Sequence, residues 1–311
     1  MVAAILVAVS GDLVGRAVNA MLIPPQAQRF ASLVGADLDR LVLNVSGWNK
    51  LVLMDSDRVF LFPRSATGVE WFERELAVYR VLARVQLSVV PRLLGRWEDP
   101  EIYPFPFAAV TRLRGEVPAD PEALIEQLGR AIACWHELEP PLLAGARPPR
   151  HHEASYHRWL RRALDQATCA TAAAEAAGRL DCPARASAWA DLLTSAAQLA
   201  PVLVHGDIHE DQLLADGGQL TGIIDWETAR VDHPFWDFDF GEWGTGLWRR
   251  HRRDFSALWA RGWIAYAQTR GLDTDPRPLE TAFRIRHALR LLADPGDPAV
   301  VGTIEEHLSA L

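Results

Sequence analysis

The chain has 311 residues, a formal net charge of −8 and an apolar fraction of 49%. This length can supply two hydrophobic cores, and the apolar fraction is that of an ordinary globular protein. The negative net charge argues against broad binding of nucleic acid.

The first nine residues are apolar, but they resemble neither a membrane segment nor a signal peptide. They lack a basic leader and are much shorter than the roughly 20 residues that a membrane span needs. We therefore expect them to belong to the fold or to form an extended start, and we expect no membrane association. The three cysteines, Cys134, Cys169 and Cys182, show no metal-binding spacing, which favours a reducing, cytoplasmic compartment.

The first third of the chain predicts a small antiparallel sheet with helices. Residues 24–34 predict a short helix with proline in its first turn. Short β-rich runs alternate between residues 41 and 62, with turns around Gly47 and around residues 55–57. Residues 47–50 then form a turn at the tip of the sheet.

A second helix and two more strands complete this region. Apolar residues recur at helical spacing from Val69 to Leu82, with Glu73 and Arg80 on the outer side. Strands are expected at residues 92–97 and 105–113. Because the pattern breaks at residues 114–116, we place a hinge between two lobes near residues 110–114.

The rest of the chain predicts mainly helices, which makes the fold α+β with two lobes, residues 1–112 and residues 113–311. Residues 121–138 carry Leu124, Leu128, Ile132 and Trp135 on one helical face. Further helices are expected at residues 154–174, 184–199, 255–269, 279–292 and 304–308.

The segment from Leu203 to Trp226 carries the strongest functional signal. Asp207 follows an apolar run, Gln212 lies five residues later, and Asp225 ends a β-rich run. A kinase catalytic loop has this spacing: an acid beside the acceptor hydroxyl, an amide ligand for magnesium, and a second acid for the metals on the nucleotide phosphates. A single Asp near Gly usually makes a turn, but three positions in register favour phosphoryl transfer.

In phosphoryl transfer, the protein mainly positions the reactants and neutralises charge. Asp207 can accept the hydroxyl proton only if it is held rigidly, and the turn at His205 and Gly206 provides a close-packed backbone for this purpose. Gln212 and Asp225 offer the hard oxygen ligands that Mg²⁺ prefers.

These residues resemble the aminoglycoside phosphotransferase family, small-molecule kinases with a bilobal protein-kinase-like fold. His205–His209 resembles the family's catalytic loop, Ile224–Trp226 its metal-binding strand end, and Asp232–Asp237 its D-P-x-W-D segment. The resemblance implies that Asp207 is the catalytic base, that Gln212 and Asp225 hold the metal, and that the last acid, Asp237, supports the site. His205 is expected to order the loop.

The resemblance extends upstream and covers roughly residues 41–239. Gly47–Asn49 resembles the nucleotide-loop turn, Phe62–Arg64 the end of the third strand, and Arg74–Leu76 the N-lobe helix. It implies ATP or GTP with Mg²⁺ as cofactors. The residues that we expect to bind the nucleotide are Ser46, Gly47, Lys50, Arg64, Glu75, Thr111 and Leu113.

The chain differs from the family at the position of the third-strand cation that binds the nucleotide phosphates. Lys50 is the only lysine, and the family's R-F-P-R sequence is replaced by a run in which Leu61 takes the first place and Arg64 the last. Either Arg64 or Lys50 is expected to substitute, which leaves the partner of Glu75 open. Gln212 in place of the family's Asn keeps the oxygen but adds a methylene.

Two other functions are considered. His205, Asp207 and His209, with His151, His152 or His157, resemble the ligands of a metal-dependent hydrolase, but that interpretation does not explain the positions of Gln212 and Asp225. A nucleotide-binding pseudokinase is supported only by Leu61 and is disfavoured because Asp207 and Asp225 are both present.

The acceptor is expected to be a small molecule with a hydroxyl group, and an aminoglycoside or aminosugar is the first choice. The residues predicted to contact it are His209, Asp237 and Glu242. Macrolides, choline and homoserine are alternatives, because the family's scaffold serves them too.

Overall fold

The computed structural model describes residues 21–138 except 46 and 48, residues 200 and 202–238 except 233, and residues 256–273 and 275. The described residues form two compact units. Of the described residues, the first unit contains those between 21 and 119 together with Glu210–Ala229, and the second contains those in 120–138, 200–209, 230–238 and 256–275. The lobe boundary expected at residue 112 stays a prediction, but the segment after the catalytic loop belongs with the N-terminal unit.

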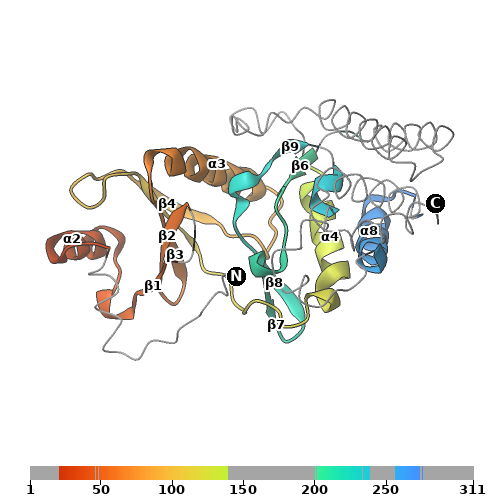
Figure 1. Ribbon diagram of the computed structural model, residues 1–311, viewed down its shortest axis with the longest axis horizontal. Coiled ribbons are helices and arrows are strands. Elements are labelled where there is room, and N and C mark those ends of the chain that lie inside the picture. Colours follow the sequence, from red (N-terminus) through yellow and green to blue (C-terminus); the bar gives the residue numbers. More distant parts are fainter. Residues whose placement is uncertain are drawn as a thin grey trace, which may run out of the picture. The chain divides into compact units, whose positions relative to one another are not determined.

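A five-stranded antiparallel sheet forms the centre of the first unit, with strand order β1-β2-β3-β5-β4 (Figure 1). Each strand pairs with its neighbours in antiparallel fashion. The prediction of an antiparallel N-terminal sheet is confirmed. The strands are β1 (Val42–Asn44), β2 (Lys50–Met54), β3 (Arg58–Pro63), β4 (Leu93–Trp97) and β5 (Phe107–Thr111).

Helix α2 (Pro24–Val34) packs against one face of this sheet through an aromatic cluster. The ring of Phe30 lies 5.1 Å from that of Phe60, 5.6 Å from that of Phe62 and 5.8 Å from that of Phe107, measured between centroids. Because side chains alternate along a strand, Phe60 and Phe62 leave Leu61 on the opposite face.

Helix α3 (Ala66–Leu82) follows β3 directly. Ser65 caps its first turn by accepting a hydrogen bond from the amide of Gly68 at 3.1 Å. Phe72, Leu76 and Tyr79 are buried, as the helical spacing predicted, but Glu75 is buried as well.

A hairpin from the later part of the sequence joins the first unit. It consists of β7 (Leu213–Asp216) and β8 (Gln219–Ile223). The amide of Ile223 donates a hydrogen bond to the carbonyl of Val89 at 2.7 Å. The segment after β5 is bonded to the same hairpin through Glu116 and Ala215, whose amides and carbonyls pair at 2.8 and 3.0 Å. The hairpin therefore fixes Gln212 just before β7 and Asp225 just after β8 within this unit.

The second unit contains α4 (Ile125–Trp135), which begins after a 3₁₀ turn at Pro121–Leu124, and α8 (Ser256–Arg270). These two helices pack against each other. Strand β6 (Val202–Val204) pairs with β9 (Arg230–Asp232). The helices expected near residues 121–138 and 255–269 are confirmed, whereas those at 154–174, 184–199, 279–292 and 304–308 lie outside the described residues. None of the described helices is both long and apolar enough to cross a membrane.

The contact between α4 and α8 gives a prediction for stability. A Cβ at Gly129 would collide with the backbone carbonyl of Gly262, so the helices approach there by backbone contact. We expect Gly129→Ala to lower the free energy of unfolding by about 1–3 kcal/mol, although alanine is the better helix former. Urea unfolding measures the change, and Arg130→Ala on the exposed side of α4 is the matched control; equal stability of both variants would contradict this packing.

Candidate active site

The turn after β6 presents Asp207 on a closely held backbone. His205 is fully buried and Ile208 nearly so, while Asp207 between them is exposed. Gly206 has φ +80°, a conformation that strongly favours glycine. The fold of the loop thus exposes the acid that the sequence predicts as the base.

The carboxylate of Asp237 holds this loop from behind. Asp237 lies in a 3₁₀ turn (Pro234–Phe238) and is completely buried. Its Oδ2 accepts the amide N–H of His205 at 3.0 Å, and its Oδ1 accepts that of Gly206 at 2.9 Å. Both residues directly before Asp207 are therefore fixed by one buried acid, which is the supporting role that the resemblance implied for Asp237.

A hydrogen-bond chain continues from Asp237 to helices α4 and α8 of the second unit. Trp135 Nε1 donates to Oδ2 at 3.0 Å, and His136 Nε2 lies 3.1 Å from the same oxygen. A carboxylate only accepts hydrogen bonds, so His136 carries its proton on Nε2. Its Nδ1, 3.1 Å from the hydroxyl of Tyr266 on α8, then accepts from that hydroxyl.

The charges of this buried chain follow from its contacts. Burial lowers the pKa of His136 although Asp237 opposes the shift, so the imidazole is neutral. Burial acts to raise the pKa of Asp237, but the hydrogen bond from His136 and the other donors outweigh it and lower that pKa. Burial raises the pKa of Tyr266 to about 12. The loop is thus held by an ionised acid and neutral donors.

The two predicted metal ligands lie on adjacent backbone segments of the first unit. The amide of Ile224 donates to the carbonyl of Gln212 at 3.0 Å, which brings Asp225 next to Gln212 in the fold. Asp225 has φ +68°, a left-handed conformation that Asp tolerates better than most residues. Its side chain is 41% exposed, whereas Gln212 is buried.

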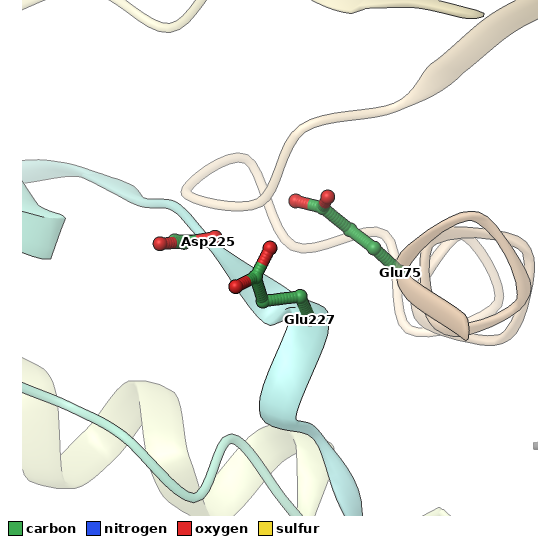
Figure 2. A group of neighbouring side chains, drawn as sticks. All are labelled: Glu75, Asp225 and Glu227. Atoms are coloured by element: carbon green, nitrogen blue, oxygen red, sulfur yellow. The ribbon is translucent and has the colours of Figure 1, made fainter. Parts of the chain in front are cut away.

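The ammonium of Lys50 lies among three carboxylates of the same unit. Nζ is 2.5 Å from Glu75 Oε2, 2.8 Å from Asp225 Oδ1 and 3.1 Å from Glu227 Oε2. Figure 2 shows Glu75 extending from α3 toward Asp225 and Glu227, which lie on one segment. Formally, one positive charge faces three negative charges, which leaves a surplus of negative charge at Asp225.

Burial and charge act in opposite directions on this cluster. Burial alone would lower the pKa of Lys50, but Asp225, Glu75 and Glu227 outweigh it and raise that pKa well above its usual value. Burial raises the pKa of Glu75, and Lys50 opposes the shift. Burial and Glu75 raise the pKa of Tyr79, whose hydroxyl donates to Glu75 Oε1 at 2.7 Å. Lys50 therefore keeps its charge at all ordinary pH values.

Glu227 also connects the cluster to the turn before β2 and to α3. Its Oε1 accepts a hydrogen bond from Asn49 Nδ2 at 2.6 Å, and its backbone carbonyl accepts one from Arg74 at 3.2 Å. The guanidinium of Arg74 stacks over the ring of Trp71. These contacts were not predicted from the sequence.

Arg64, the second cation that the sequence offered, is used elsewhere. Its Nε donates to the carbonyl of Lys50 at 3.3 Å, its NH2 group donates to the carbonyl of Val45, and its amide donates to the carbonyl of Asn49 at 2.9 Å. Arg64 therefore shapes the turn before β2 and does not pair with Glu75. The sequence left the partner of Glu75 open, and the structure identifies it as Lys50.

The remaining predicted residues have simpler surroundings. Thr111 is bonded to Arg92 through both its amide and its hydroxyl, at 2.9 Å each. The side chain of Leu113 packs against Gly222 of β8. Gly47 is exposed and His209 is half-buried. Ser46 and Glu242 lie outside the described residues.

Comparison with known proteins identifies the family. The sequence profile of the Phosphotransferase enzyme family matches residues 33–282. The chain belongs to this family. No curated protein sequence matches the chain.

Solved structures show the same fold as this phosphotransferase. The macrolide 2'-phosphotransferase MphH from Brachybacterium faecium is similar with a TM-score of 0.54 at 19% identity, over 92% of this chain and 98% of that chain. The aminoglycoside phosphotransferase APH(2'')-Ib, solved with ADP, gives a TM-score of 0.52 at 14% identity, over 92% and 97%. The GDP complex of aminoglycoside 2'-phosphotransferase-IIIa gives 0.51 at 18% identity, over 87% and 91%.

Membership of the family confirms the predicted kinase-like fold and the phosphotransferase class. The hydrolase interpretation loses its support, because the chain belongs to the Phosphotransferase enzyme family. The pseudokinase interpretation rested on Leu61 alone, and the structure supplies a cation at Glu75 through Lys50.

The neutral state of His136 predicts a pH dependence of stability in this phosphotransferase. The folded pKa lies below the usual value of about 6.5, so the unfolded chain binds the proton first as the pH falls. The contribution of His136 is complete above that value and is lost as the pH falls through the folded pKa, at about 1.4 kcal/mol per unit of pKa depression. We expect the stability advantage of the wild type over His136→Gln, measured by urea unfolding, to shrink between pH 8 and pH 5.5; a constant difference would contradict it.

Proposed function

We propose that this phosphotransferase transfers the γ-phosphoryl group of ATP or GTP to a hydroxyl group of an aminoglycoside, an aminosugar or a similar small molecule. The observation that carries the proposal is the exposed Asp207 directly after two backbone amides that the buried Asp237 holds in place. The fold that it shares with macrolide and aminoglycoside phosphotransferases agrees with such an acceptor.

In the proposed reaction, the acceptor hydroxyl oxygen forms a bond to the γ-phosphorus while the bond from that phosphorus to the β,γ-bridging oxygen breaks. ADP or GDP leaves with the electron pair of the broken bond. Asp207 accepts the hydroxyl proton, which requires an ionised and exposed carboxylate. The fixed amides of His205 and Gly206 limit the movement of this acid, and positioning of this kind supplies much of the rate.

The donor set after β8 suits magnesium. Gln212 and Asp225 offer an amide oxygen and a partly exposed carboxylate oxygen from neighbouring backbone segments, and both are hard ligands. The surplus negative charge around Lys50 favours a divalent cation at Asp225. When bound, Mg²⁺ neutralises charge on the nucleotide phosphates.

The remaining site residues keep their predicted roles as part of this proposal. Gly47 and Ser46 stay predicted contacts of the nucleotide. In the hinge, the amides of Thr111 and Arg112 already donate to protein carbonyls, which leaves Leu113 as the better of the two predicted hinge contacts for the base. Use of a cytoplasmic nucleotide agrees with the compartment that the cysteines predicted.

The acceptor is assigned to residues beside the catalytic loop. His209 is half-buried two residues after Asp207 and stays a predicted contact, together with Glu242. Asp237 has both oxygens engaged in hydrogen bonds inside the second unit, so the geometry favours its supporting role over the predicted contact with the acceptor.

Replacement of the base gives the first kinetic test. We expect Asp207→Asn to lower kcat by about 10²–10⁴-fold, because the amide cannot accept the proton, with little change in nucleotide affinity. The assay follows ATP and GTP consumption with a panel of aminoglycosides, aminosugars and macrolides. Asp216→Asn, an exposed acid on β7, is the matched control. Wild-type kcat in Asp207→Asn would refute the assignment.

Replacement of the amide ligand tests the metal. We expect Gln212→Met, which keeps the size of the side chain but removes the oxygen, to raise the Mg²⁺ concentration for half-maximal rate by about tenfold or more. Gln219→Met, exposed at the start of β8, is the control. An unchanged Mg²⁺ dependence in Gln212→Met would show that this oxygen does not bind the metal.

A further inference from the structure

The position of Lys50 in the sheet differs from the place where protein kinases keep their phosphate-binding lysine. In protein kinases this lysine is on the third strand and pairs with a glutamate of the N-lobe helix. Here the third strand carries Leu61, which is 6% exposed, and the partner of the helix glutamate comes from β2. The cation that pairs with the helix glutamate therefore lies on the second strand, and not on the third strand as in protein kinases.

The strand register shows that both positions serve the same side of the sheet. Val52 of β2 lies opposite Leu61 of β3, and Lys50 lies opposite Pro63. Residues that face each other across an antiparallel pair point to the same face, as do residues two apart on one strand. Lys50 is therefore a diagonal neighbour of Leu61 on one face, while the aromatic cluster under α2 occupies the other.

The surroundings of Lys50 are built to hold a charged ammonium at this place. The ammonium is enclosed by three carboxylates, with Nζ 2.5 Å from Glu75, 2.8 Å from Asp225 and 3.1 Å from Glu227. Tyr79 fixes Glu75 from behind, and Asn49 fixes Glu227. The ammonium also contacts Asp225, the predicted metal ligand, which brings the cation next to the place where the phosphates are expected.

We propose that Lys50 on β2 is the cation that binds the nucleotide phosphates, and that it replaces the third-strand cation of kinases one strand away. Glu75 and Glu227 are its positioning residues, one from α3 and one from the 3₁₀ turn after Asp225. This inference rests on the proposed function and adds to it the residue that contacts the phosphates. It also explains how the chain keeps an apolar residue at position 61.

The first experiment moves the cation back to the third strand. We expect Lys50→Met to lower kcat/KM for the nucleotide by about 10²-fold or more. Lys50→Arg keeps the charge and controls for a folding defect. We expect its kcat/KM to lie between that of the wild type and that of Lys50→Met, because the planar guanidinium does not reproduce a compact ammonium. The double variant Lys50→Met with Leu61→Lys should recover part of the loss.

The control for the double variant is Lys50→Met with Gln219→Lys, which adds a lysine on the exposed hairpin β7–β8. Recovery in the Leu61→Lys double variant alone supports the proposal. Wild-type kcat/KM in Lys50→Met, or equal behaviour of the two double variants, would overturn it.

The second experiment needs no substitution and no acceptor. Because Lys50 is the only lysine, labelling with ¹⁵N-lysine gives a single ammonium nitrogen to follow by NMR. We expect Mg²⁺ with the non-hydrolysable analogues AMP-PNP or GMP-PNP to shift this signal, and adenosine or guanosine to leave it nearly unchanged. Absence of nucleotide binding, or binding with an unmoved signal, would overturn the proposal. A shifted signal in an enzyme that turns over no acceptor would refute the proposed transfer while it supports the role of Lys50.

Discussion

The buried ion cluster of Lys50 is the interaction on which the first unit depends. A charge at this depth is tolerated only with partners, and its three partners come from α3 and from the segment after β8. The cluster therefore links β2, α3 and the hairpin β7–β8 through one ammonium. Asp225 is one of the three carboxylates, so this ion cluster also determines the position of the predicted metal ligand.

A second buried charge links several segments of the second unit in a similar way. The carboxylate of Asp237 accepts hydrogen bonds from Trp135, His136 and the two amides directly before Asp207. In both units, a buried charged residue contacts or supports an exposed acid for which a role in the reaction is predicted. Rigid support behind an exposed acid is what a reaction governed by positioning requires.

The sequence predicted the elements and the spacing of the functional acids, because both depend on local patterns. Apolar periodicity located α3 and α4, and the distance from Asp207 to Asp225 identified the loop and the strand end. The partner of Glu75 was beyond such reasoning, because it depends on the register of β2 against β3 and on the direction of a long side chain. Alternation along β3 separates Leu61 from Phe60 and Phe62, but only the pairing of Val52 with Leu61 shows that Lys50 lies on the same face as Leu61. Likewise, Tyr266 and His136 lie about 130 residues apart, and no local pattern indicates that they share a hydrogen bond.

A crystal structure of the protein with Mg²⁺ and AMP-PNP or GMP-PNP would show directly which cation contacts the nucleotide phosphates. We expect Lys50 Nζ to lie within hydrogen-bonding distance of an oxygen of the α- or β-phosphate while it stays paired with Glu75. We expect Arg64 still to bind the carbonyls of the turn before β2. Phosphates contacted by Arg64 or another arginine, with Lys50 directed away from them, would contradict this expectation.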